Sequence, residues 1–177
     1  GGLLWAESDT DTLRWHSVDA CAPVLADMRI FHTGAPNDST GTVADAVRAR
    51  RAQDPAAFES IINRIETATR ALRDLLSTPD VAPEALVELL QEGEACLEAL
   101  GVVPPAIRAH IRKIEAQGGA AKISGAGALT DPHAGSLIAY HPDPDADVWA
   151  SFAPFSSFNV PLCVPGAHPL PSAYVHG

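Results

Sequence analysis

Lysine is scarce in this chain. Lys113 and Lys122 are the only lysines among its 177 residues, and Lys and Arg together number 12 against 22 Asp and Glu. The formal net charge of −10 argues against a surface that binds nucleic acid or anionic membranes, because such surfaces need clustered cations. Enzymes that handle phosphates also need positive charge near them. If this protein handles phosphates, the positive charge would have to come from metal ions, from backbone amides or from another part of the protein.

Long apolar runs and paired cysteines are missing as well. No stretch reaches the roughly 20 apolar residues of a membrane span, so we expect a soluble, cytoplasmic protein with no membrane partner. The cysteines number three, an odd count, and have no CxxC spacing, so neither a disulfide framework nor a zinc site is indicated. We interpret Cys21, Cys96 and Cys163 as buried small hydrophobic residues.

No catalytic or metal-binding motif is present in the sequence. The Asp-Pro-His segment at residues 131–133 lacks the spacing that aligns metal ligands, so we expect no metal site in this chain. The GxSxG pattern of a nucleophile elbow is absent, and Ser124 lies in SGAG instead. We nominate no catalytic residue. The scattered histidines include His16, His32, His110, His133 and His141.

Apolar runs bounded by turn residues predict strands near both ends of the chain. The first two flank a polar turn, as in a hairpin, and the third ends at Gly34. A glycine-rich connection separates the fourth and fifth, and a proline-rich tail follows the last. We expect these strands at residues 1–7, 12–18, 24–34, 120–125, 135–141 and 159–164.

Apolar residues at spacings of three and four predict helices between those strands. A helix begins near Thr40 after a loop that offers an N-cap, Pro79 and Pro83 separate the next two, and Gly118 ends another. A short last helix is expected within residues 145–158. The apolar positions are Phe58, Ile61, Ile62, Ile65, Leu72, Leu75 and Leu76, and then Leu86, Leu89, Leu90, Leu97 and Leu100. We interpret Glu84, Glu88, Glu92, Glu94 and Glu98 as a solvated face.

This order of elements indicates an α+β fold. Strands at both ends with helices between them favour an antiparallel sheet with the helices packed on one face, of the ferredoxin-like kind. The glycine-rich connection SGAGALTDPHAG is neither a Walker A loop nor a dinucleotide-binding fingerprint. Its composition leaves two interpretations: a long hairpin connection, or a cradle of backbone amides that closes on a phosphate.

A second loop, at the end of the third predicted strand, is rich in hydroxyl groups. Thr33, Ser39 and Thr40 lie in it, directly before a predicted helix. Such side chains cap helices in most proteins, and they can also bind a substrate or phosphate oxygen. The residues alone leave both roles open.

Taken in order, these segments resemble a known family. Leu100–Gly101–Val102 ends one helix, another helix follows, and the sequence Ala-Lys-Ile-Ser-Gly-Ala-Gly occupies residues 121–127. Upstream, FHTGAPNDST places Thr33 and Thr40 at the spacing of a second family motif. Over residues 1 to about 164 the chain resembles the C-terminal part of the GHMP small-molecule kinases, and the mevalonate kinases most closely. It departs from them at residues 129–133, where most have a run of glycines, and at Gly93, where they tend to have a polar residue.

The resemblance implies two domains with different roles. Residues 1–23 would form strands at the junction with an N-terminal kinase domain, and residues 24–177 would form the GHMP kinase C-terminal domain. The catalytic aspartate, the phosphate loop and an active-site lysine would lie on the N-terminal domain, which would bind most of the ATP and Mg²⁺. This chain alone would then be inactive.

The implied activity is transfer of the ATP γ-phosphoryl group to the hydroxyl of mevalonate, a step in isoprenoid precursor synthesis. By resemblance, residues near the glycine-rich connection would support ATP and its phosphate loop: Lys122, Ser124, Gly125, Ala126, Gly127 and Ala128. Thr33, Ser39 and Thr40 would lie on the substrate side. A GHMP kinase for phosphomevalonate, homoserine or a sugar is the near alternative. A kinase-derived binding or dimerisation module without catalysis is the other, and exposed apolar strands would then favour a homodimer.

Overall fold

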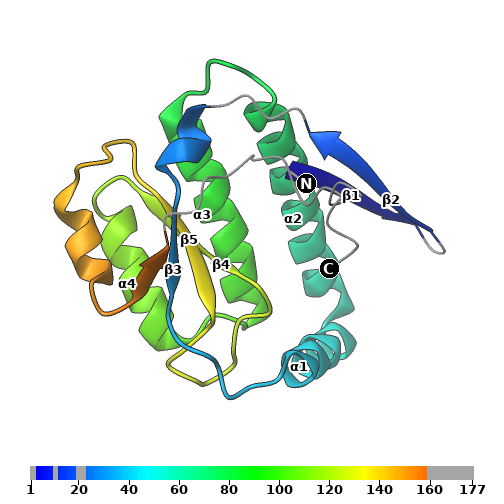
Figure 1. Cartoon of the computed structure of the whole chain (residues 1–177). Coiled ribbons are helices and arrows are strands. Elements are labelled where there is room, and N and C mark those ends of the chain that lie inside the picture. Colours follow the sequence, from blue (N-terminus) through cyan, green and yellow to red (C-terminus); the bar gives the residue numbers. More distant parts are fainter. Residues whose placement is uncertain (1–2, 10–11, 19–22, 159–177) are drawn as a thin grey trace, which may run out of the picture.

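A four-stranded antiparallel sheet with helices beside it forms the main body of the protein (Figure 1). The computed structural model describes residues 3–9, 12–18 and 23–158. The strands are β1 (Leu3–Asp9), β2 (Thr12–Val18), β3 (Arg29–His32), β4 (Ala120–Ser124), β5 (Ser136–Tyr140) and β6 (Ser156–Phe158). The α-helices are α1 (Thr40–Gln53), α2 (Pro55–Leu76), α3 (Pro83–Leu100) and α4 (Pro105–Glu115), and the 3₁₀ helices are η1 (Pro23–Asp27) and η2 (Asp147–Phe152).

The strand order of the sheet is β4-β5-β3-β6. Both β3 and β4 pair antiparallel with β5, so they run in the same direction. Their following connections, β3 to α1 and β4 to β5, therefore leave the sheet at the same end (Figure 1). This topology brings the two loops that the sequence singled out to one place.

Local signals in the sequence set the helix ends. The Ser39 side chain accepts from the backbone N–H of Thr42 at 3.1 Å, which confirms the predicted N-cap of α1. Pro83 occupies the first turn of α3, and Gly101 ends that helix with φ of 78°, a left-handed conformation that favours glycine.

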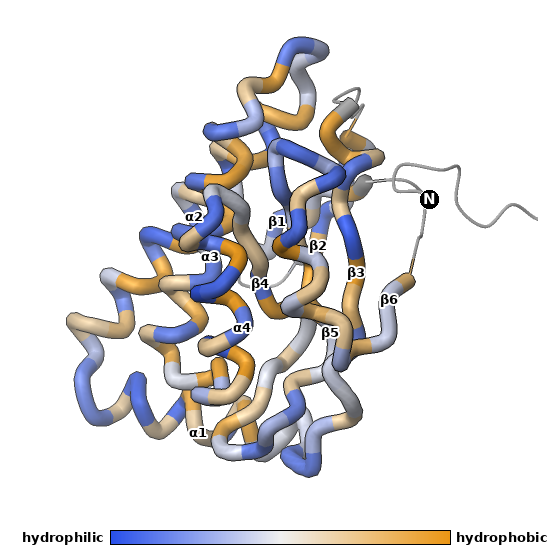
Figure 2. The backbone as a smooth tube through the Cα atoms, turned by 90° about the vertical axis from the view of Figure 1, so that its left-hand side faces the viewer, coloured by the Kyte–Doolittle hydropathy of each residue, from blue (hydrophilic) through white to orange (hydrophobic). Residues whose placement is uncertain are grey.

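The main core lies on one face of the sheet. Figure 2 shows α2, α3 and α4 to one side of β5, β3 and β6. The strands contribute every second residue to this core, as the period of two requires, and α4 and η2 cover it. Its members include Phe31, Ala121, Ile123, Leu137 and Ala139 from the strands, Ile107, Ile111 and Ile114 from α4, and Val148 and Phe152 from η2.

Two predicted segments were wrong in part. The predicted strand at 24–34 is the 3₁₀ helix η1 followed by the short β3. Leu25 of η1 is buried in a cluster with Leu76 of α2, and Val24 and Met28 pack against that cluster. The predicted helix within 145–158 is η2 followed by β6, which pairs with β3. Pro154 interrupts helical hydrogen bonding there. The predicted strand at 159–164 lies outside the described residues.

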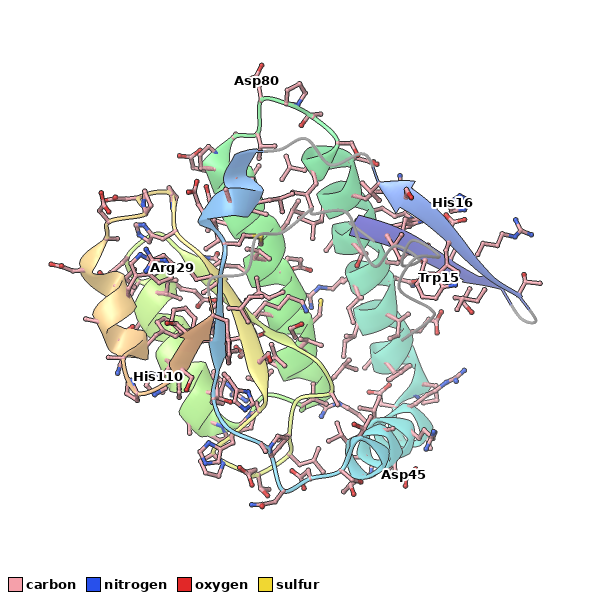
Figure 3. All side chains as sticks on the ribbon, viewed as in Figure 1. Trp15, His16, Arg29, Asp45, Asp80 and His110 are labelled. Carbon is pink, nitrogen blue, oxygen red and sulfur yellow. The ribbon has the colours of Figure 1, made fainter. Side chains whose placement is uncertain are left out.

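The predicted hairpin at the start of the chain is confirmed. β1 and β2 pair antiparallel and lie beside α2, with the Arg73 guanidinium 4.6 Å from the centre of the Trp5 ring (Figure 1). Leu4, Leu13 and Trp15 of this hairpin are about half exposed (Figure 3 labels Trp15). Among the described helices, none has the length and apolar character needed to cross a membrane.

Candidate functional site

The β3–α1 and β4–β5 loops form one interconnected structure at the end of the sheet. The backbone N–H of Leu129 donates to Asp38 Oδ2 at 2.8 Å, and the N–H of Asn37 donates to Asp131 Oδ2 at 3.1 Å. Since these partners are more than ninety residues apart in sequence, the hydrogen bonds hold the two loops at a fixed distance from each other.

Thr33 joins the two loops through three hydrogen bonds. Its backbone N–H and its hydroxyl donate to the carbonyl of Gly135, at 2.8 and 3.0 Å, and its hydroxyl accepts from the N–H of Ala134 at 2.8 Å. Only 4% of Thr33 is exposed. The structure thus places this predicted substrate-side hydroxyl inside the loop pair, where it both donates and accepts.

The Asp-Pro-His segment at 131–133 is a second link. The Asp131 carboxylate accepts from the N–H of His133 at 2.8 Å and from the backbone and side chain of Asn37. The hydrogen bond from His133 is the main reason that the pKa of Asp131 is lowered. The His133 ring contacts the Thr33 carbonyl and fills the space where Gly34, at φ of 113°, has no side chain. This segment therefore fastens the longer β4–β5 loop to its neighbour.

The first part of the β4–β5 loop, residues 124–128, is here called the glycine loop. Gly125 and Gly127 have positive φ values, 127° and 73°. At its end, the N–H of Ala128 donates to the carbonyl of Val102 at 3.0 Å. The N–H groups of Gly125, Ala126 and Gly127 have no acceptor among the described residues. Consecutive main-chain donors in a glycine-rich turn can bind an anion.

The remaining predicted site residues lie around this loop. Ser39 caps α1, and Thr40 is its exposed first residue, two positions after Asp38, which holds Leu129. Ser124 is exposed at the end of β4. Lys122 instead points toward α3: its ammonium donates to the Ile123 carbonyl at 3.0 Å, and burial lowers its pKa.

The described residues hold no group of three or more His, Cys, Asp or Glu side chains that could bind a metal ion. Figure 3 shows His16 on the hairpin and His110 on α4 at opposite sides of the molecule. The His110 ring packs 4.7 Å from the Phe155 ring and its Nδ1 contacts the Ser151 carbonyl. Cys96 is buried, as predicted; Cys21 and Cys163 lie outside the described residues.

Comparison with solved structures finds a similar fold in two kinases and in a third protein. Mevalonate kinase from L. major, in complex with R-mevalonate, has a TM-score of 0.63 at 19% identity, over 86% of this chain and 44% of that chain. A protein from Listeria innocua has 0.65 at 19% identity, over 82% and 42%. Phosphomevalonate kinase from Streptococcus pneumoniae, in complex with phosphomevalonate and AMPPNP, has 0.55 at 14% identity, over 80% and 38%. The fold is that of the GHMP kinases.

The GHMP kinase fold confirms the predicted fold class, that of a C-terminal domain. The chain spans less than half the length of each of these three structures. No protein-family model matches the chain, and no curated protein matches it by sequence. The likeness is therefore one of fold.

The sequence did not lead us to expect one buried, hydrogen-bonded residue beside the glycine loop. Glu94, predicted to be solvated, is completely buried between α3 and β4, and its Oε2 accepts from the N–H of Ile123 at 2.9 Å. A signal was present, because Glu94 lies four residues after Leu90 and three before Leu97, on the apolar stripe of the helix. The prediction of a fully solvated face was wrong at this position. Glu92 and Glu98, in contrast, form ion pairs with arginines.

Proposed function

We propose that this chain is the C-terminal part of an ATP-dependent kinase that phosphorylates a small-molecule alcohol. The observation that carries the proposal is the glycine loop, whose three consecutive N–H groups at 125–127 lack acceptors among the described residues. The loop is anchored at Val102 and, through Leu129, at Asp38. Anchoring fixes these donors in place before a phosphate arrives, which is how phosphoryl-transfer sites gain most of their catalysis.

The donors of the glycine loop suit phosphate oxygens, and the part of the chain that the structure describes holds no group of three or more His, Cys, Asp or Glu side chains that could bind a metal ion. Backbone amides supply donors without side-chain charge, which agrees with the two lysines of the chain. Mg²⁺ would neutralise the ATP phosphates, and we assign its ligands to the part of the kinase that precedes this chain. We propose that Ser124 and Ala128 close the two ends of the amide cradle. Lys122 would support the loop from the α3 side.

We place the alcohol substrate on the side of the β3–α1 loop. Thr40 is exposed at the N terminus of α1, where its hydroxyl and the helix dipole favour an anionic substrate. Ser39 and Thr33 would act there by shaping the backbone, since their hydroxyls already bind Thr42 and the loop pair. Mevalonate is the substrate that we propose first. Phosphomevalonate, homoserine and sugars are the alternatives within the same fold.

The outer face of the hairpin is our proposed contact with the N-terminal kinase domain. In the register of the hairpin, Leu4, Ala6, Leu13 and Trp15 share one face, because Ala6 pairs with Trp15 and the side chains alternate. Three of these side chains are about half exposed. An apolar face of this kind calls for a partner surface. It supports the proposed boundary near residue 23, and self-association is the outcome expected if that partner is lacking.

The test is Mg²⁺-dependent ATP turnover by the full-length protein that carries this chain. The panel consists of mevalonate, phosphomevalonate, homoserine and galactose. We expect turnover with mevalonate above the others, and none from residues 1–177 alone. Turnover with phosphomevalonate or another alcohol in place of mevalonate would correct the substrate. Absence of turnover with every substrate would leave the non-catalytic binding or dimerisation module as the better reading.

A further inference from the structure

β4 is an edge strand whose open side is covered by α3. Among the described strands, β4 pairs only with β5, so every second backbone group on its other side needs another partner. At Ile123, the N–H donates to Glu94 Oε2 at 2.9 Å and the carbonyl accepts from the Lys122 ammonium at 3.0 Å. The residue next to the glycine loop is therefore held at the strand edge by two charged side chains.

The burial of the Glu94 carboxyl group is unusual, because glutamate side chains are rarely buried completely. It is completely buried, and its second oxygen, Oε1, has no partner among the described residues. Burial raises the pKa of Glu94 to about 7, although the hydrogen bond from Ile123 and the charge of Lys122 oppose that shift. The other charged groups that face it are Glu98 on the same helix and Glu115 on α4, and both favour protonation.

Gly93 leaves space beside the Glu94 carboxylate for the side chain of Lys122. A Cβ on Gly93 would lie 3.2 Å from Lys122 Cε, so the absence of a side chain there makes room for the lysine stem. A cavity of about 140 Å³ adjoins Gly93 and Lys122 and is lined by apolar side chains of α2 and α3. This explains the glycine in the middle of α3. It also keeps the ammonium close enough to Glu94 to influence its charge.

We infer that Glu94 is a positioning residue for the glycine loop, holding the open edge of β4 against α3 directly before the loop begins. The inference rests on the proposed function, because it concerns the same loop. An ionised carboxylate is the stronger acceptor for the Ile123 N–H. The cost of burying that charge is larger, however, because a pKa of about 7 means that the closed edge binds the proton more tightly than an open edge with a solvated carboxyl group. Ionisation of Glu94 as the pH rises through about 7 therefore loosens the edge of β4 and the amide cradle beyond it.

Hydrogen exchange of the full-length protein tests this hold directly. Peptides covering residues 120–128 are followed by mass spectrometry in the parent, Glu94→Leu, Glu94→Gln and the control Glu88→Gln, an exposed glutamate on the same helix. We expect about tenfold faster exchange in Glu94→Leu, which loses a hydrogen bond to a charged group. Glu94→Gln retains an acceptor, so it stays protected. It should lose the fall in protection that the parent shows above about pH 7, after correction for intrinsic exchange rates.

A kinetic measurement separates positioning from a merely structural role. In the kinase assay, kcat of the parent should fall with increasing pH through about 7, and Glu94→Gln should lack that component while Glu88→Gln keeps it. Exchange in Glu94→Leu at the parental rate, or parental pH dependence in Glu94→Gln, overturns the inference. A parent that phosphorylates no substrate overturns the proposed function instead, and the exchange result then decides on Glu94 alone.

Discussion

The backbone of Gly127 lies directly against the carbonyl oxygen of Val102. A Cβ on Gly127 would lie 2.1 Å from that oxygen, which also accepts from the N–H of Ala128 at 3.0 Å. The turn after α3 and the loop after β4 are therefore built as one unit, with no room for a side chain between them. This contact gives a physical reason why the Leu-Gly-Val turn and the SGAG loop belong to the same motif.

Gly127→Ala should destabilise the protein strongly. The methyl group must displace backbone rather than a flexible side chain, and φ of 73° adds strain, so we expect a loss of about 3 kcal/mol in the free energy of unfolding. Gly135→Ala is the matched control, because Gly135 has φ of 76° and no atom within 4 Å of its added Cβ. Its cost should be about 1 kcal/mol, from the left-handed backbone alone. Equal losses in denaturant unfolding would contradict the packing argument.

Gly125→Val tests the amide cradle rather than the packing. A Cβ there meets nothing within 4 Å, as at Gly118, and both glycines have positive φ. Gly118→Val should therefore cost similar stability while leaving kinase activity unchanged. Gly125→Val places a branched side chain beside the three amides, and we expect kcat/KM for ATP to fall about a hundredfold. If the two variants are equally active, the loop serves only as a hairpin connection.

The parts of the fold that the sequence predicts correctly depend on local signals. The N-cap Ser39, the first-turn proline Pro83, the β1–β2 hairpin and the strands around the glycine loop all follow from residues close together in the chain. The role of residues 131–133 does not, because Asp131 finds its partner Asn37 on another loop, 94 residues away. Apart from the family resemblance, only the sheet order shows that these loops share one end.

Glu94 illustrates a second limit, in which a local signal was present but pointed to two outcomes. A glutamate on an apolar helical stripe either reaches solvent at the edge of the stripe or is buried with a hydrogen-bond partner. Most glutamates are exposed. Only the knowledge that β4 is an edge strand beside α3 shows which backbone N–H the carboxylate satisfies. The edge position of β4 is a property of the whole sheet.

Stability should depend on pH through Glu94. Its pKa is about 7 in the folded protein against 4.5 as the ordinary value, so the folded state binds the proton more tightly. The resulting stabilisation is present at low pH and is lost as the pH rises through about 7. Relative to Glu94→Gln, the parent should gain roughly 2 to 3 kcal/mol in unfolding free energy between about pH 8 and pH 5. A constant difference between the two proteins over this range would show that Glu94 keeps its ordinary pKa.

Thr33→Val tests whether the buried hydroxyl joins the two loops. The valine side chain has the same shape but neither donates to the Gly135 carbonyl, which keeps the backbone N–H of residue 33, nor accepts from the N–H of Ala134, which is left without its acceptor. We expect a loss of about 2 kcal/mol in unfolding free energy and faster exchange of the Ala134 amide. Thr33→Ser keeps the hydroxyl and removes only a methyl group, so it should cost about 1 kcal/mol and leave that amide protected. Equal effects of the two substitutions would mean that packing of the methyl group, rather than the hydroxyl, holds the β3–α1 loop to the β4–β5 loop.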